Sequence, residues 1–575
     1  MPSDPNPLMS RTDFNQPPGP VRHGLEAIDP ARFARSAWIV SLIAAVVWFA
    51  LLGSRPLFRP DEGRYAEIPR EMLASGDWLV PRLDGLVYVE KPPLQYWMTA
   101  GLYRVFGTHV WVARLAPGLS AALGILLAGW TARRLWGSQA TAVACVMCAS
   151  SPLYFLLGQQ LTLDMSFTLW MTAALAAFCV GQSVRGDLRR CRRWMMLCWA
   201  AVAGAILAKG LAALAIPAIA LVVYSIWQRD VAVWRSSHIA LGLTLCLVLA
   251  APWFIAMSRT VPGFAQFFFI HEHFLRYATL SADRYEPWWF FVPVVLAGIA
   301  PWLPQAVSAW RSSAADRAPP GDFDARRLLW VWVAVVFLFF SASKSKLIPY
   351  VLPVVPPLAL VIAAGRSSLT VRSLRWSVVI TFAAAVILLA ALAWFSVNAQ
   401  EGKQVALAGL ILPGIVAMTL TLTLCGLATL WALGRFGPAA ATFSIAAGWF
   451  VGGVLLVGWL AAAAGPLYSA ERMARILKTR TPSPTHVYSV GYYEQTLPFY
   501  LRRTIDVVEF TGELEFGLRL DPARVLSMDD FRSRWRADAG AYAVMEHETY
   551  RALANGGLPM TIIEQDPNYL LVGRP

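Results

Sequence analysis

The sequence has few charged residues. Only 15% of its 575 residues are charged and 57% are hydrophobic, whereas soluble domains carry roughly a quarter charged residues. A water-soluble protein is therefore excluded, and most of the chain is expected to lie in lipid. The net charge of +14 does not indicate a nucleic-acid partner, because the basic residues fall in short connectors between apolar runs, as the positive-inside rule describes.

Cysteine is scarce too. There are seven cysteines, and none follows residue 463, so no disulfide is expected in the carboxyl-terminal tail. Cys145 and Cys148 have the spacing of half a zinc site, but no second ligand pair follows them and they lie inside an apolar run. A structural zinc site is therefore not expected there.

Long apolar runs dominate the rest. A membrane-spanning helix needs about 20 apolar residues, which predicts about thirteen spans. They lie near 37–53, 111–135, 139–157, 162–183, 194–208, 210–228, 238–257, 288–308, 328–342, 347–364, 374–396, 405–432 and 438–462. No small-residue cleavage site follows the first run, which indicates an anchor rather than a signal peptide.

The arginines predict an orientation. Every second connector is arginine-rich, which places the amino terminus in the cytoplasm and the carboxyl-terminal tail outside. Residues 94–108 are apolar but short, and they contain Arg104. If they crossed the membrane, the arginine clusters would lie outside. They are therefore predicted to form an interfacial helix at the outer membrane face.

Three regions follow from these patterns. Residues 1–36 are Pro-rich and polar, and are expected to be disordered in the cytoplasm. Residues 37–462 form an all-α polytopic membrane domain with long outer loops at 54–110 and 258–287. Residues 463–575 alternate short strand-like and helix-like runs, which predicts a small extracytoplasmic α/β domain.

The first outer loop carries the most informative polar residues. Asp61 and Glu62 come directly after the first span, and Glu90 and Lys91 precede two prolines. Paired acids suit a catalytic or substrate-binding role, and a lysine suits a phosphate. The alternatives are an amphipathic surface helix with solvated charges and a local ion pair, which contributes little if exposed.

Later segments add ionisable residues near the outer face. Asp164 and Lys209 lie at the ends of predicted spans, and Lys344 and Lys346 lie in a predicted outer loop. Such groups are costly near lipid and are functional candidates by default. The alternatives are a helix cap for Asp164 and snorkelling of Lys209 to the interface.

The second long outer loop contains two closely spaced histidines. His271 and His273, together with Glu90, would make a zinc site. The alternative is that these histidines hydrogen-bond to backbone or head group. No cofactor is expected to be required for the reaction, and zinc remains an alternative.

Several segments resemble a known family. DEGRYAEIPREMLASGDWLVPRLDG and YVEKPPLQYW look like the first outer loop of bacterial polyprenyl-phosphate-dependent glycosyltransferases of the protein-mannosyltransferase (GT-C) type, and among them the lipid A 4-amino-4-deoxy-L-arabinose transferases. FFFIHEHFLRY, PWWFFVPVVL and SKSKLIPYVLPVVPPLAL are similar to later blocks of that family. The resemblance covers about residues 35–465.

The resemblance implies an inner-membrane enzyme of GT-C type. It would move aminoarabinose from undecaprenyl phosphate, with inversion, to lipid A or another extracytoplasmic acceptor at the periplasmic face, a modification tied to polymyxin resistance. Its implied catalytic residues are Asp61, Glu62 and Asp164. The implied substrate-binding residues are Arg64, Arg82, Glu90, Lys91, Lys209, Glu272, His273, Arg276, Lys344 and Lys346.

Charge alone leaves the acceptor open. An anionic lipid A phosphate needs no general base, and Asp61 would then orient the sugar or pair with its ammonium. A protein hydroxyl needs a base, and Asp61 is the candidate. A mannose-type hexosyltransferase is therefore an alternative. A lipid transporter would spread polar residues through mid-membrane positions, which this sequence does not do.

Overall fold

The computed structural model describes residues 30–275, 286–315, 318–365, 369–398, 402–480 and 486–574. The chain forms a small unit, Met1–Val47, and a large unit, Trp48–Pro575. Helix α1 (Pro30–Leu51) begins at residue 30, so residues 30–36, which the sequence assigns to a disordered segment, are helical. The remainder of that segment lies outside the described residues.

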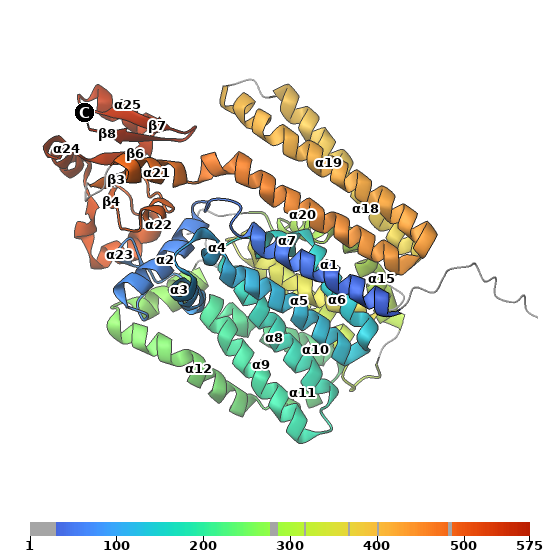
Figure 1. Ribbon diagram of the computed structural model, residues 1–575. Helices are drawn as coiled ribbons and strands as arrows, with labels where there is room; N and C mark the ends of the chain where they lie inside the picture. Colours follow the sequence, from blue (N-terminus) through green and yellow to red (C-terminus); the bar gives the residue numbers. More distant parts are fainter. Residues whose placement is uncertain are drawn as a thin grey trace, which may run out of the picture. The chain divides into compact units, whose positions relative to one another are not determined.

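Helices make up the region that the sequence assigns to the membrane (Figure 1). They are α5 (Leu115–Trp136), α6 (Ser138–Ser150), α7 (Pro152–Gly158), α8 (Leu163–Ser183), α9 (Leu188–Lys209), α10 (Ala212–Gln228), α11 (Ala232–Ser236), α12 (Ile239–Thr260), η1 (Gln266–Leu275), α14 (Phe291–Gly298), η2 (Ala300–Trp302), α15 (Leu303–Ala315), α16 (Ala325–Ala342), η3 (Ile348–Val354), α17 (Val355–Ala364), α18 (Val371–Asn398), α19 (Gly402–Phe436) and α20 (Pro438–Tyr468).

Among the described residues, eight helices are long and apolar enough to cross a membrane, or up to ten if two bent pairs are each one span. The pairs bend by 66° after Ser150 and by 75° after Gly298. Three shorter apolar helices accompany them, and every predicted span overlaps one of these elements. The polytopic prediction is confirmed, although the number thirteen is not. Helix α3 (Leu94–Phe106) is not among the candidate spans.

The first outer loop folds into a helical layer. Helix α2 (Asp61–Ser75) packs on α3, and a hairpin of β1 (Arg82–Leu83) and β2 (Leu86–Val87) lies between them in the sequence. The hairpin turns at Asp84 and Gly85, whose φ angles of 55° and 79° are the positive values that such a turn requires. Glu71 on α2 fixes this turn, because its carboxylate accepts the N–H groups of Asp84 and Gly85 at 2.6 and 2.9 Å. A short helix, α4 (Val110–Ala113), follows α3.

The carboxyl-terminal region contains the predicted α/β fold. Its six-stranded sheet has the order β5-β4-β3-β6-β8-β7, with β5, β4, β3 and β6 parallel and the last two strands antiparallel. The strands are β3 (Val487–Val490), β4 (Asp506–Val508), β5 (Val525–Leu526), β6 (Tyr542–Glu546), β7 (Thr561–Gln565) and β8 (Tyr569–Gly573). The helices are α21 (Glu471–Arg480), α22 (Leu497–Leu501), η5 (Gly512–Leu514), α23 (Glu515–Leu520), η6 (Pro522–Arg524), α24 (Met528–Ala537) and α25 (His547–Asn555).

The outer loop and the carboxyl-terminal domain share one hydrophobic core. Buried Tyr65, Tyr96 and Tyr103 from the loop belong to the same cluster as Tyr493 and Phe499. The rings of Tyr103 and Phe499 lie 6.3 Å apart, within the range of favourable aromatic pairs. In Figure 1, α2 accordingly lies beside α22, and strand β2 of the loop contacts α23. The last hundred residues therefore help to hold the first outer loop in place.

Candidate active site

One cavity of about 1210 Å³ brings together most of the predicted site residues. It is lined by the start of α2, the Glu90–Lys91 segment, the start of α8, the α9–α10 junction, Glu272 of η1 and the segment from Ser343 to Tyr350. Leu211, Leu214 and Ala215 are among its apolar residues. A cavity with apolar walls and a few convergent charged groups is the usual form of a ligand site.

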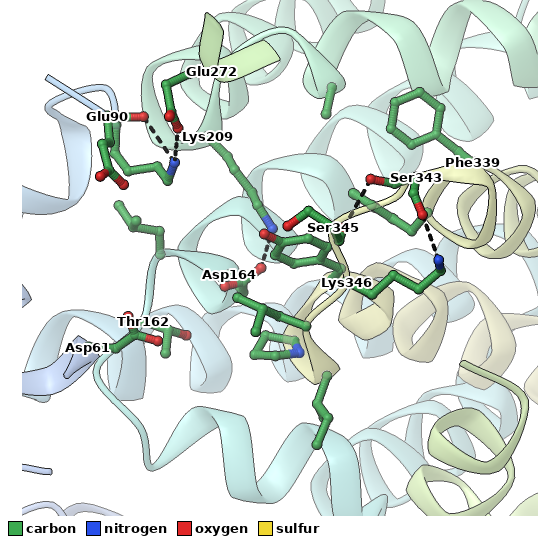
Figure 2. Close-up of a pocket in the computed structure, with 18 of the residues that line it drawn as sticks. Asp61, Glu90, Thr162, Asp164, Lys209, Glu272, Phe339, Ser343, Ser345 and Lys346 are labelled. Atoms are coloured by element: carbon green, nitrogen blue, oxygen red, sulfur yellow. Dashed lines mark hydrogen bonds and ion pairs between the residues drawn. The ribbon is translucent and has the colours of Figure 1, made fainter. Parts of the chain in front are cut away.

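Three ion pairs lie around this cavity. Asp61 pairs with Arg64 one turn further along α2. Asp164, in the first turn of α8, pairs with Lys209, in the last turn of α9. Figure 2 shows these two side chains meeting in the cavity, with Asp61 nearby. Each pair has a side chain that is only partly buried, so its charges remain within reach of a ligand.

The third ion pair joins two outer loops. Lys91 donates to the Glu272 carboxylate at 3.1 Å and to the backbone carbonyl of Glu90 at 3.0 Å. Lys91 and Glu272 are 181 positions apart in the sequence, so only the fold shows that they meet. The predicted substrate-binding residues Glu90, Lys91 and Glu272 are thus brought to one side of the cavity.

Lys209 lies in an aromatic setting as well. Its ammonium is 4.1 Å from the ring centre of Tyr350, 5.4 Å from that of Phe167 and 5.5 Å from that of Phe340. Cations over aromatic faces gain electrostatic stabilisation where water is scarce. Together with Asp164, these rings hold the Lys209 ammonium at the end of an apolar helix.

Arg64 is the most enclosed cation of the site. Its side chain is 3% exposed, and its guanidinium contacts Asp61 and, at 3.3 Å, Glu513 of the carboxyl-terminal domain. It also lies 5.0 Å from the ring centre of Tyr65. Among the described residues, its Nε atom has no hydrogen-bond partner. Glu513 was missed by sequence reasoning, because nothing in its local sequence connects it to a loop more than 400 residues away.

Comparisons with known proteins identify the family to which the chain is related. The family model "Aminoarabinose transferase C-terminal domain" matches residues 473–574, and "Dolichyl-phosphate-mannose-protein mannosyltransferase" matches residues 37–268. The crystal structure of ArnT from Cupriavidus metallidurans bound to undecaprenyl phosphate aligns with a TM-score of 0.83 at 34% identity, over 93% of this chain and 98% of that one. The chain belongs to the aminoarabinose transferase family.

Curated members of the aminoarabinose transferase family align over a shorter stretch. The undecaprenyl phosphate-alpha-4-amino-4-deoxy-L-arabinose arabinosyl transferase of Erwinia tasmaniensis is 36% identical over 58% of this chain and 59% of its own length. Its counterpart in Edwardsiella ictaluri is 36% identical over 58% of this chain and 60% of its own. The chain thus covers about three fifths of the length of these relatives. With its apolar helices, membership of the family makes it a multi-pass inner-membrane protein.

Glu62 does not line the cavity of this protein. Its carboxylate, 1% exposed, binds Arg55 at 2.5 and 2.9 Å and Arg114 at 2.8 Å, and accepts the N–H groups of Phe58 and Leu161. Burial alone raises the pKa of Glu62, but the two guanidinium groups outweigh it and hold the pKa well below its usual range. The sequence grouped Glu62 with Asp61 as catalytic. The structure separates them, because the buried Glu62 carboxylate joins the segment after α1 to the residues that precede α5 and α8.

Arg82 is also placed away from the site. Its side chain is 38% exposed and lies 3.8 Å from that of Asp77, and it does not line the cavity. Its predicted substrate-binding role therefore lacks the required position. Lys344 does not line the cavity either, whereas Lys346 does, donating to the backbone carbonyls of Glu286 at 2.7 Å and Ser343 at 2.6 Å.

The predicted zinc ligands are only partly described. The Nδ1 atom of His271 lies 3.7 Å from Glu272, the side chain of His273 is not described, and Arg276 lies outside the described residues. Across the part of the chain that the structure describes, no group of three or more His, Cys, Asp or Glu residues could hold a metal ion. The zinc site and the roles of His273 and Arg276 stay predictions.

Some cavity residues were not selected from the sequence. Tyr65, Thr162, Glu286 and Tyr350 line the cavity beside the predicted residues. Tyr350 lies in the SKSKLIPY segment, so its family resemblance was a usable signal. Thr162, which directly precedes α8, gave no signal of its own because a polar residue before a helix is ordinarily a cap.

Proposed function

We propose that this protein transfers 4-amino-4-deoxy-L-arabinose from undecaprenyl phosphate to a phosphate of lipid A at the periplasmic face of the inner membrane. The observation that carries the proposal is the set of three ion pairs around one apolar-walled cavity at the ends of apolar helices. The names of the aligned relatives support the choice of sugar and lipid carrier.

The cations would hold the donor phosphate. Arg64, Lys91 and Lys209 each come to the cavity with a carboxylate partner. A phosphate entering between them can take over part of these contacts, so its charge is neutralised without bringing unpaired lysines into an apolar site. The prenyl chain would lie against the apolar wall, where many weak contacts supply affinity.

The carboxylates would act on the sugar. The bond between the anomeric carbon and the carrier phosphate breaks, and its electron pair leaves with undecaprenyl phosphate. A lipid A phosphate oxygen forms the new bond from the opposite face, which inverts the configuration. Since that oxygen is already anionic, no general base is required. Asp61 and Asp164 then orient the sugar and pair with its ammonium, while the cations stabilise the charge that grows on the leaving phosphate.

A second candidate uses the same residues with another acceptor. The match of residues 37–268 to the mannosyltransferase family favours transfer of a hexose to a protein hydroxyl. That acceptor must lose a proton, and Asp61 would then serve as the base.

The decisive experiment uses the purified full-length protein in lipid. Undecaprenyl phosphate-aminoarabinose and lipid A are supplied, and lipid A is analysed by mass spectrometry for added aminoarabinose. Undecaprenyl phosphate-mannose serves as the competing donor and a hydroxyl-bearing peptide as the competing acceptor. Addition of aminoarabinose to lipid A supports the proposal. Transfer of mannose to the peptide, with unmodified lipid A, would replace it with the second candidate.

Orientation needs its own measurement. With the amino terminus in the cytoplasm, a reporter fused after Gly137 should be cytoplasmic, and one fused after Pro575 should be periplasmic. The opposite result at either point would contradict the proposed face of the reaction.

A further inference from the structure

The segments at the carboxyl ends of strands β3 and β4 lie against the start of α2. In the order β5-β4-β3-β6, the chain leaves β3 toward β4 on one side and reaches β6 on the other. Open parallel sheets of this kind usually bind ligands at the carboxyl ends of the strands next to such a reversal. Here the segments that follow β3 and β4, namely residues 491–496 and 509–514, contact α2 and the residues just before it.

The contacts between these segments and the start of α2 are close, and one of them is an ion pair. Arg59, which precedes α2, pairs with Glu494 and lies 4.1 Å from the ring centre of Tyr569. Gly63 packs so tightly that a Cβ atom there would lie 2.6 Å from the backbone of Gln495. Only glycine permits two backbones to approach in this way. The first turn of α2 is therefore held directly by the carboxyl-terminal domain.

Glu513 extends this contact to the cavity. Its Oε2 atom accepts from Arg64 at 3.3 Å, and its Oε1 atom accepts from the Gln495 side chain at 3.2 Å. Arg64 in turn binds Asp61, which lines the cavity. A continuous series thus runs from Gln495 through Glu513 and Arg64 to Asp61. Glu513 does not line the cavity, and its hydrogen bond to Arg64 joins it to a residue that does.

We propose that Glu513 of the carboxyl-terminal domain is a positioning residue for sugar transfer, which sets the orientation of Arg64 and hence of Asp61. The inference rests on the proposed function and deepens it. Two carboxylates bind the Arg64 guanidinium: Glu513 accepts from one terminal nitrogen and Asp61 from the other. Without the Glu513 charge, both terminal nitrogens of the Arg64 guanidinium can donate to Asp61, because carboxylates prefer two-point pairing with arginine. Asp61 is then withdrawn from the sugar.

A simple docking role would predict a different result. The domain is also held by the Arg59–Glu494 pair and by the shared aromatic core, so Glu513→Gln should leave it attached. In that variant kcat should fall roughly ten- to a hundredfold, as expected when catalytic groups are misplaced by about an ångström. The KM for the donor should change by less than about threefold, because the prenyl chain still supplies most of the affinity. Glu513→Asp, which keeps the charge, should recover part of the lost rate.

The matched control is Glu515→Gln. Glu515 lies two positions further on, its side chain is 58% exposed, and it pairs with Arg519 on its own helix. Its kcat and KM should equal those of the wild type. Gel filtration and limited proteolysis establish that each variant is folded. If Glu513→Gln does not fold, Gln495→Met, which removes the bond to Oε1, should lower kcat in the same direction. Wild-type kcat in that variant would overturn the proposal.

A double-mutant cycle identifies the route of the effect. In an Arg64→Lys background, adding Glu513→Gln should cost no more than about twofold in kcat, because groups that act in series do not have additive effects. Losses that multiply would show that Glu513 does not act through Arg64. If wild-type protein transfers aminoarabinose and Glu513→Gln does so equally fast, this inference alone is wrong. If wild-type protein transfers only mannose, the proposed function is wrong, and the same cycle is measured with that donor.

Discussion

The ion pairs around the cavity differ sharply from the ion-pair network next to them. Asp61 and Glu62 are neighbours in the sequence, yet the Asp61 side chain is 31% exposed and the Glu62 side chain 1% exposed. Glu62 is bound by two guanidinium groups and two backbone N–H groups. The buried network fixes geometry and cannot exchange partners. The open pairs can, which is what a site that receives a charged ligand requires.

The strongest test of this contrast removes charge from the open pairs. Asp61→Asn and Asp164→Asn are near-isosteric, so both proteins should fold and insert normally. Single-turnover transfer should fall by about 10²-fold, because these carboxylates hold the reacting sugar in position. Retention of the wild-type rate by Asp61→Asn at saturating donor would remove that residue from the site.

Removal of the Glu62 charge from the buried network should lower the stability of the protein rather than its transfer rate. Glu62→Gln leaves Arg55 and Arg114 without a carboxylate, and breaking a buried pair in this way costs about 3–5 kcal/mol. We expect a lower Tm and a lower yield, with kcat per folded molecule close to that of the wild type. A normal Tm combined with abolished transfer would return Glu62 to the catalytic residues and end the distinction.

The sequence predicts the helices better than it predicts these pairings. Apolar runs locate the spans because burial in lipid acts on each segment separately. The role of Glu62 depends on Arg114, 52 positions away, and that of Lys209 on Asp164, 45 positions away. Such contacts are set by helix packing, which no local pattern reports. Strands β5 and β7 give a weak local signal for another reason: β5 has two residues, and β7 is largely exposed.

Substitution of Lys91 tests a cation of the cavity, and its expected effect on transfer is smaller than that of the carboxylates. Lys91→Ala removes one of the three cations proposed to hold the donor phosphate, so undecaprenyl phosphate should bind nearly as well through its prenyl chain. Single-turnover transfer should fall about tenfold or more, because leaving-group charge is largest in the transition state. Arg82→Ala, a cation of the same loop outside the cavity, is the control and should behave as wild type. Much weaker binding with normal turnover at saturation would show that Lys91 only holds the lipid.

The smallest expected effect concerns pH. Burial raises the pKa of Asp84 from 3.8 to about 7, with Glu71 adding to the shift and Arg524 opposing it. The folded protein therefore binds this proton more tightly than the unfolded chain, so stability is full below about pH 4 and is lost as pH rises through 7. The Tm should therefore decline between about pH 4 and pH 7 and change little above about pH 8. The decline should be smaller in Asp84→Asn, which keeps the turn, and unchanged in Asp521→Asn at an exposed site. An equal decline in Asp84→Asn would assign it to other groups.

The contact between Arg59 and Glu494 has a consequence for biosynthesis. The two residues are 435 positions apart, and the ribosome makes Arg59 and α2 long before it makes the strands that hold them. During translation the first turn of α2 has no partner for Arg59, no surface for Gly63 and no Glu513 for Arg64. Every intervening helix is synthesised before this turn can settle. A nascent chain therefore carries all the cavity carboxylates but an unfinished site, and activity begins only when the last domain has folded.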